Sequence, residues 1–495
     1  MQPGKDRQWV TAALLLGSFL SAVEATAVAA AVPTAVGEMG GVSRYSWVFS
    51  AYLLTSTTTV PMYGKLADLF GRRPVYHAAV ALFLLGSALS GFATSLEQLI
   101  LFRALQGLGA GGVMPVASTL VGDIYSLEER GRIQALFSGI WAASGLLGPL
   151  VGGLITDALS WRWIFFLNIP FGILSSVILQ RSLQEETVRR AHRLDVLGTV
   201  SLTAGVTFLL IALTEGPEAW GWSDPRTLAF LAGSVLSLVV FFWQELRAPE
   251  PMLPLHIFRN RVISVSGMGN AIIGVMLFAV TAYVPVFAQG VLGGTAVDAG
   301  TILAPILIGW PISSVLAGRW LLRMSYRRMA LGGSVLITVG TLILARSDAD
   351  TTRTGVMVAL FIIGFGLGFL SMPYMISVQN AVPWGLRGVA TGTVQFFRTM
   401  GGAIGVAALG ALFNSRLHAS GGAGLDANSA LDPALRAKLS PDALGQLTTA
   451  LLSGLQGVFV VLFCIAVVAI GVAVIFPRGS AQSLAMREER PEAAS

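Results

Sequence analysis

Long apolar runs alternate with short polar breaks along almost the whole chain. Each run is close to or above the roughly 20 residues that a helix needs to cross a bilayer. The breaks carry glycine, proline and charged residues, which are typical of loops between spans. We therefore predict an all-α integral membrane protein with fourteen transmembrane helices, at about 9–36, 46–67, 75–94, 99–122, 133–157, 163–181, 195–214, 227–246, 262–289, 298–322, 327–346, 354–380, 387–414 and 450–476.

The composition agrees with a membrane protein and excludes several other classes. Of 495 residues, 54% are hydrophobic and only 12% are charged, which is too apolar for a set of soluble domains. The basic residues are spread through short loops rather than clustered, so the high pI of about 9.8 does not indicate nucleic-acid binding. The chain lacks a Gly-x-x-x-x-Gly-Lys-Ser/Thr loop, which argues against an ATP-driven pump.

The distribution of basic residues predicts the orientation in the membrane. An even number of helices places both termini on the same side, and most of the 32 Lys and Arg residues fall in loops on that side. By the positive-inside rule that side is cytoplasmic, so we expect a multi-pass protein of the cytoplasmic membrane. Two arginines, Arg103 and Arg398, fall inside the predicted helices instead.

An internal repeat defines the architecture. Several short patterns recur at one constant offset along the chain. The matched positions are Gly107, Gly109 and Gly111 with Gly364, Gly366 and Gly368; Arg130-Gly131 with Arg387-Gly388; and Gly145 and Gly148 with Gly402 and Gly405. Such a duplication predicts two pseudo-symmetric six-helix bundles, at 1–190 and 251–495, with two inserted helices at 191–250. Parallel halves of this kind indicate a transporter that rocks about a site near the midplane.

The first apolar run carries an acid, Glu24, near its middle. An ionised carboxylate there is costly by several kcal/mol, and intramembrane acids commonly mark proton pathways. Burial favours the neutral form of the acid unless a cation lies near. The equivalent position of the second half is near Phe278, which cannot titrate. We predict that Glu24 is the principal proton site; the alternative is a structural acid that stays paired with an arginine.

Arg103 is the natural partner for this acid. It lies one turn into the fourth apolar run, beside Gln106 and Gly107, and its repeat counterpart is Leu360. Snorkelling to the membrane surface is the alternative, but the glycine-rich face that follows favours burial against another helix. We predict that Arg103 tunes the protonation of Glu24.

The basic turn at 64–74, between the second and third runs, predicts a conformational gate. Gly64 and Gly71 allow a close approach of the backbone. Asp68 can cap the start of the thirteenth helix, near Arg387, on the same side of the membrane. The proposed gate comprises Gly64, Asp68, Gly71, Arg72 and Arg387. The alternative is a solvated loop that serves only to set the topology.

Two further sets of residues are candidates for function. The segment 144–153 combines a proline with close-packing glycines, a pattern that kinks a helix and lets a neighbour approach its backbone; its members are Gly148, Pro149, Gly152 and Gly153. Polar and aromatic residues near mid-depth are candidates for contact with a substrate, namely Tyr52, Trp141, Asn270, Gln395 and Phe396.

Taken together, these segments resemble the major facilitator superfamily, and specifically its fourteen-helix drug–proton antiporters. The resemblance extends from Trp9 to about Phe476. It rests on a loop 2–3 signature at 64–73, a helix 4 arginine motif at 99–111, a helix 5 antiporter motif at 144–153, a helix 1 acid motif at 24–33, and the segments 161–170 and 254–260. The acid of the helix 1 motif, usually aspartate, is Glu24 here, and Ser144 replaces the first glycine of the antiporter motif.

The resemblance implies proton-coupled efflux of hydrophobic or amphipathic drug-like compounds by alternating access. It implies no enzymatic activity, no metal and no cofactor beyond the proton gradient. The expected partners are a small substrate, protons and membrane lipid, with a monomer as the expected state. Two alternatives stay open: an exporter of lipids or metabolites with the same coupling, and a transport-inactive membrane sensor.

Overall fold

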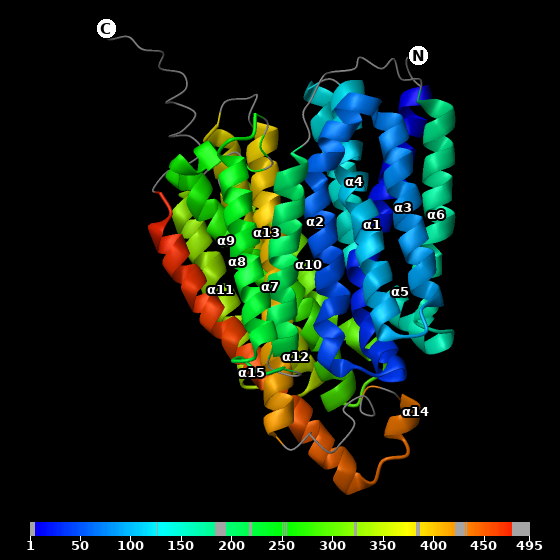
Figure 1. The fold of residues 1–495 in the computed structure, drawn as a ribbon, viewed down its shortest axis with the longest axis vertical. Helices are drawn as coiled ribbons and strands as arrows, with labels where there is room; N and C mark the ends of the chain where they lie inside the picture. Colours follow the sequence, from blue (N-terminus) through cyan, green and yellow to red (C-terminus); the bar gives the residue numbers. More distant parts are fainter. Residues whose placement is uncertain are drawn as a thin grey trace.

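Helices account for nearly all of the ordered structure. The computed structural model describes residues 5–125, 127–183, 195–216, 220–249, 251, 253, 255–320, 324–382, 387–420, 431 and 433–477, and this part of the chain contains no strand. The α-helices (Figure 1) are α1 (Lys5–Met39), α2 (Tyr45–Phe70), α3 (Arg72–Phe92), α4 (Leu96–Ile124), α5 (Leu127–Ala158), α6 (Arg162–Ser182), α7 (Val196–Glu215), α8 (Pro225–Glu245), α9 (Arg261–Val286), α10 (Ala296–Trp320), α11 (Tyr326–Ala345), α12 (Arg353–Asn380), α13 (Arg387–Ala419), α14 (Pro433–Arg436) and α15 (Pro441–Ile475).

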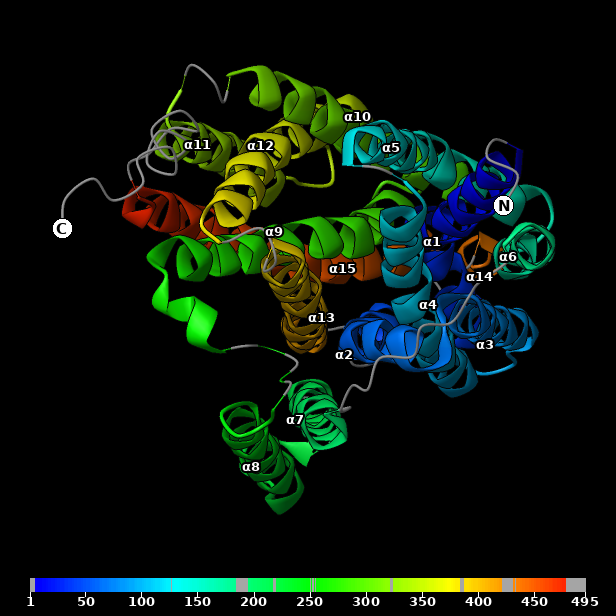
Figure 2. The same ribbon diagram turned by 90° about the horizontal axis from the view of Figure 1, so that it is seen from above.

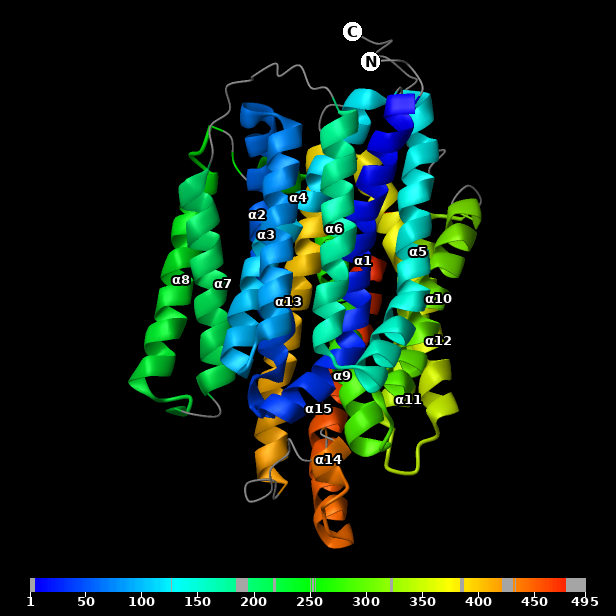
Figure 3. The same ribbon diagram turned by 90° about the vertical axis from the view of Figure 1, so that its right-hand side faces the viewer.

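The predicted all-α membrane architecture is confirmed. Within the described residues, 13 helices are long and apolar enough to cross a membrane. The 26-residue helix α2, whose sequence is rich in serine and threonine, lies among them between α4 and α13. The last helix begins about two and a half turns earlier than its hydropathy suggested, because Ser440 caps its N-terminus and Pro441 starts its first turn. The C-terminal end of α13, the start of α15 and the short α14 project on the side opposite the termini (Figure 3).

The helices form two bundles and one separate pair. One bundle contains α1 to α6, and the other contains α9 to α13 with α15 (Figure 2). Helices α7 and α8 pack on each other and lie outside both bundles, where α7 touches α2 and α13. The pair therefore lies at the edge of the interface between the two bundles, which is called the seam below. It leaves the two-bundle plan intact.

The duplicated glycines serve the same packing role in both halves. The outer two glycines of each triplet face one neighbouring helix, and the middle glycine faces another. In α4, Gly107 and Gly111 face α2 and Gly109 faces α3; in α12, Gly364 and Gly368 face α10 and Gly366 faces α11. Backbone-to-backbone packing of this kind needs residues without a side chain. The repeat in the sequence is therefore a repeat of helix contacts.

The two bundles are joined tightly at the end opposite the termini. The carboxylate of Asp157, at the end of α5, accepts hydrogen bonds from the backbone N–H groups of Ala296 and Val297 at 3.2 and 3.0 Å. These N–H groups begin α10, so the contact caps a helix of the other bundle. Gln289, in the π-helical segment Phe287–Val291 that follows α9, donates to the carbonyl of Ala30 in α1 at 3.0 Å.

The contact between α5 and α10 becomes looser towards the end that carries the termini. Along α5, a Cβ atom at Gly153 would lie 2.6 Å from the carbonyl oxygen of Ala296, whereas one at Gly145 would meet Leu307 at an ordinary 3.4 Å. Trp141, one turn further along the same face of α5, is 40% exposed. The contact between α5 and α10 thus loosens from one end of the molecule to the other, as expected for a bundle pair that rocks.

A glycine packed against backbone and a glycine in ordinary contact with a side chain should respond differently to substitution by alanine. A Cβ at Gly109 would lie 2.3 Å from the backbone nitrogen of Phe83 and 2.6 Å from the carbonyl oxygen of Ala79. Because backbone cannot move aside cheaply, Gly109→Ala should destabilise the protein by about 1–3 kcal/mol. Gly145→Ala should be tolerated. Thermal unfolding of the purified variants in detergent tests this, and equal melting temperatures for the two would contradict it.

Candidate functional site

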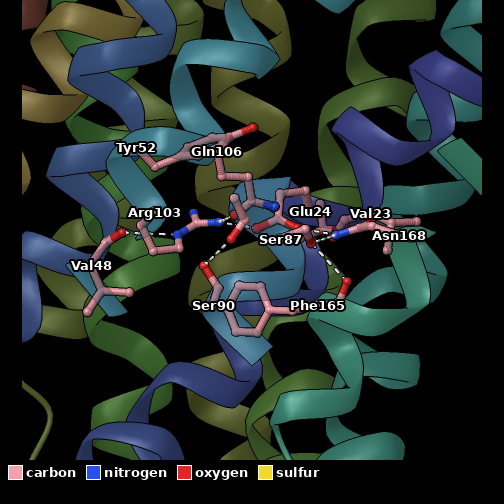
Figure 4. A network of polar contacts seen from close by, with 12 residues as sticks. Val23, Glu24, Val48, Tyr52, Ser87, Ser90, Arg103, Gln106, Phe165 and Asn168 are labelled. Carbon is pink, nitrogen blue, oxygen red and sulfur yellow. Dashed lines mark hydrogen bonds and ion pairs between the residues drawn. The ribbon is translucent and has the colours of Figure 1, made fainter. Parts of the chain in front are cut away.

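A buried network of polar side chains lies in the middle of the first bundle (Figure 4). Its centre is the ion pair between Glu24 of α1 and Arg103 of α4, in which Nη1 of the guanidinium donates to Oε1 of the carboxylate. Both residues are almost fully buried, at 1% and 2% exposure. The structure thus brings together the acid and the arginine singled out in the sequence, while their part in proton transport stays a prediction.

The second oxygen of Glu24 is held by a residue that the sequence analysis did not single out. Asn168 of α6 donates from Nδ2 to Oε2 of Glu24 at 2.7 Å and to Oγ of Ser87 at 2.9 Å. The hydroxyl of Ser87, in α3, donates in turn to the carbonyl of Phe165 at 2.8 Å. The carboxylate is therefore oriented from both sides. The available signal was an amide in the first third of the predicted 163–181 span, within the segment 161–170.

Arg103 makes contacts that do not depend on the acid. Its Nη1 donates to Oε1 of Gln106 at 2.7 Å, and its Nε donates to the carbonyl of Val48 at 3.3 Å. The guanidinium carbon lies 4.2 Å from the ring centre of Tyr52, a cation–π arrangement. Tyr52 covers the arginine in this structure, and its predicted contact with a substrate stays a prediction. Arg103 therefore keeps partners in place when the charge of Glu24 is removed.

The antiporter-motif residues join this network to the seam. Thr26, two residues beyond Glu24 on α1, donates to the carbonyl of Ser144 in α5 at 3.1 Å. A Cβ at Gly148 would lie 2.0 Å from the hydroxyl of Thr26, so the two helices touch at this point. The remaining members continue the contact, with Gly152 against Ala27 of α1, Gly153 against Ala296 of α10 and Pro149 against Gly300 of α10. Helix α5 therefore contacts both α1 and α10, so a shift of α1 is expected to displace the contact between the bundles.

The predicted gate is described only in part. Gly71, between α2 and α3, has a φ of +94°, a conformation that favours glycine. Among the described residues, nothing lies within 4 Å of a Cβ built at Gly64, and the close approach expected there stays a prediction. Arg72 is the first residue of α3. The side chains of Asp68 and Arg387 lie outside the described part of the structure, and the predicted latch between them stays a prediction.

The five residues predicted to contact a substrate lie in different surroundings, and their contact with a substrate stays a prediction. Asn270 is buried in α9 and donates to the carbonyl of Ser266 at 2.9 Å. Phe396 packs in a cluster with residues of α2 and α7, away from Glu24. Gln395 and Trp141 are exposed. Tyr52 belongs to the network above. A helical span has several faces, and its sequence alone does not say which face meets which neighbour.

A second arginine inside a span, Arg398 of α13, received no role from the sequence. Its guanidinium carbon lies 5.9 Å from the ring centre of Trp310 in α10. The signal was present in the sequence, since a charge inside an apolar run is rare.

Comparisons with known proteins identify the chain's relatives. The model of the Major Facilitator Superfamily matches residues 14–406. The chain is 36% identical over 403 residues to "Multidrug transporter protein MdtP" of Bacillus subtilis, covering 81% of this chain and 74% of that protein. It is 33% identical over 403 residues to "Multidrug resistance protein 3" of the same organism, covering 81% and 79%. With "Efflux pump FUS6" of Gibberella moniliformis, the identity is 32% over 424 residues, covering 83% and 75%.

A solved structure shows the same fold. It is a bacterial homolog to the human lysosomal transporter Spinster, in an inward-facing and unoccupied conformation, and it matches with a TM-score of 0.69. The match covers 97% of this chain and 100% of that one, at 16% sequence identity. At this identity the likeness concerns the fold alone.

The buried ion pair predicts that the effects of substituting Glu24 and Arg103 on the free energy of unfolding are strongly coupled. Arg103→Leu leaves the Glu24 carboxylate buried without its cation, which should cost about 3–5 kcal/mol near neutral pH. Glu24→Gln in the same chain removes the stranded charge, so the double variant should be more stable than Arg103→Leu alone. The deficit of Arg103→Leu should shrink as the pH falls, because a protonated Glu24 needs no counter-ion.

Thermal unfolding in detergent across a pH series measures this cycle. A matched control is Glu97→Gln, which breaks the exposed ion pair with Arg44 (2.9 Å) and should change stability by no more than about 1 kcal/mol. Additive effects of the two substitutions, with no recovery in the double variant, would contradict the coupling.

Proposed function

Because the chain belongs to the major facilitator superfamily, we propose that it exports small hydrophobic or amphipathic compounds from the cytoplasm in exchange for protons. Family membership makes the chain a multi-pass membrane transporter and not an enzyme. The proposal of efflux draws on its relatives, which carry the names of multidrug and efflux transporters. The proposal of proton coupling draws on the site.

The observation that carries the proposal is the burial of Glu24 in the middle of a span. The side chain of Glu24 has 0% exposure. The other strongly buried acids in the described ranges serve at helix ends: Asp195 caps α7 by accepting from the N–H of Gly198, and Glu245, at the end of α8, accepts from the N–H of Leu253. A transporter with one midplane acid has one evident place to carry a proton.

Protonation of Glu24 changes the force between α1 and α4. The ionised carboxylate attracts Arg103, and two unit charges 4 Å apart interact by about 4 kcal/mol at an effective dielectric constant of 20. The neutral acid loses most of this attraction, while Arg103 keeps Gln106 and Tyr52 as partners. The charge state of Glu24 thereby weakens or strengthens the attraction between α1 and α4.

Helix α1 carries this change to the seam. Thr26 lies two residues from Glu24 and contacts α5, and Ala30 lies six residues away, about 9 Å along the helix, where it accepts from Gln289 of the second bundle. Helix α1 carries the acid and also contacts the second bundle, and an element shared by two sites can couple them. Proton binding and the rocking of the bundles are thus linked through α1.

The orientation follows from the basic loops. If the end with the termini is cytoplasmic, the closed end of the seam, with Asp157 and Gln289, faces outward. The conformation described here is then open towards the cytoplasm, the side from which a substrate to be exported enters. The membrane proposed is the cytoplasmic membrane, by the positive-inside rule.

Glu24→Gln tests the proposal because it keeps the shape of the side chain and removes its charge change. In inverted membrane vesicles that are energised with a proton gradient, the wild type should accumulate a fluorescent amphipathic compound. The Glu24→Gln variant should insert normally and lose accumulation against a gradient. Glu97→Gln removes a carboxylate at the exposed start of α4 and should accumulate the compound as the wild type does. Uphill transport by Glu24→Gln at the wild-type level would refute proton coupling through this residue.

A further inference from the structure

Arg398 of α13 is a cation inside a membrane span with no fixed counter-ion. None of the described carboxylates lies within the 4.0 Å that defines an ion pair, and the described part of the chain offers its guanidinium no hydrogen-bond acceptor. Within the described residues, the aromatic ring near it is that of Trp310, whose centre lies 5.9 Å from the guanidinium carbon. Its backbone is fixed, because the carbonyl oxygen of Arg398 packs directly against Gly274 of α9.

This arrangement is energetically incomplete. A charged side chain within the membrane is costly unless it is paired, and a cation–π contact offsets only part of that cost. Arg103, in the other bundle, shows the complete arrangement, with a carboxylate, an amide oxygen, a backbone carbonyl and an aromatic ring around it. Arg398 has the aromatic ring and lacks the anion.

The surroundings of Arg398 place it at the open part of the seam. Ala403, five residues or about 8 Å further along α13, accepts a hydrogen bond from Ser50 of the first bundle at 3.1 Å. Trp310 lies one turn beyond Leu307, the residue of α10 that meets α5 at Gly145. Both Arg398 and Trp310 are therefore next to the cross-bundle contacts, on the side where the seam loosens.

The protein's own buried acid does not supply the missing anion. Both oxygens of Glu24 are already engaged, one by Arg103 and the other by Asn168. The ion pair in the first bundle is neutral as a unit, so it leaves the positive charge of Arg398 without a counter-ion among the described residues.

We propose that Arg398 and Trp310 bind the anionic end of the transported compound, which is an amphipathic carboxylate or sulfonate. The proposal rests on the export function given above and narrows its substrate class. A guanidinium pairs with a carboxylate through two parallel hydrogen bonds, and an indole face packs against the adjoining apolar part. A neutral analogue leaves the cation unpaired, so the site discriminates by charge.

The test compares two probes that differ only at the charged end, pyrenebutyrate and pyrenebutanol. Their affinities for the purified full-length protein in nanodiscs are measured by fluorescence, with empty nanodiscs as the correction for partitioning into lipid. The wild type should bind pyrenebutyrate about tenfold more tightly than pyrenebutanol, as one charge-assisted bidentate contact provides. Arg398→Gln should lose this preference. Arg398→Lys should keep part of it, because an ammonium has charge but no planar fork.

Arg328→Gln is the matched control. It removes one positive charge from the exposed first turn of α11 in the same bundle and should keep the full preference. A wild type without preference for the anion, or an Arg398→Gln variant that retains it, would overturn the proposal. Binding is measured without a gradient, so the outcome is independent of proton coupling. Loss of coupling in the vesicle assay and loss of anion preference here are separate failures.

Discussion

A charge inside a membrane span must be paired, and this constraint organises the first bundle. Glu24 is held by donors from two helices, Arg103 in α4 and Asn168 in α6. Behind them, Ser87 of α3 supports the amide and Tyr52 of α2 covers the guanidinium. Five helices therefore converge on one carboxylate. Removing its charge changes a force on all of them at once, which is the physical basis for treating this residue as the switch.

The rest of the fold makes such a switch effective by keeping each bundle stiff. The glycine triplets in α4 and α12 allow backbone contact within their own bundles, and close-packed interiors transmit displacement rather than absorb it. The contacts between bundles are fewer and are concentrated at one end, where Asp157 caps α10 and Gln289 reaches α1. We therefore expect motion to be concentrated at the seam, where α1, which carries the acid, contacts α9 and α10. In the second bundle, Leu360 corresponds to Arg103 and the counterpart of Glu24 lies near Phe278, so the proposed switch belongs to one half only.

The sequence was informative wherever a residue or a run of residues has a large effect on the free energy of the folded protein in the membrane. Fourteen apolar runs, the repeated glycines and an acid and an arginine inside spans each leave a signal that needs no three-dimensional context. The sequence could not show that Asn168 completes the site, because its donor role depends on how α6 packs against α1. It also could not show that Tyr52 faces the arginine or that Phe396 packs towards α2 and α7, since these depend on the rotation of each helix. The early start of α15 was missed because its first turns are polar and are set by a cap.

The central claim is that the charge of Glu24 sets which end of the seam is open, and a distance across the closed end tests it directly. Spin labels at Leu159→Cys and Thr295→Cys, both exposed beside the Asp157 contact, are introduced in a Cys464→Ser background that removes the chain's one cysteine. Pulsed electron paramagnetic resonance in nanodiscs then gives the populations of short and long distances between pH 5 and 8. We expect these populations to change with pH in the otherwise wild-type protein and to stay constant when Glu24→Gln is added. The same pH response with and without Glu24→Gln would contradict the account.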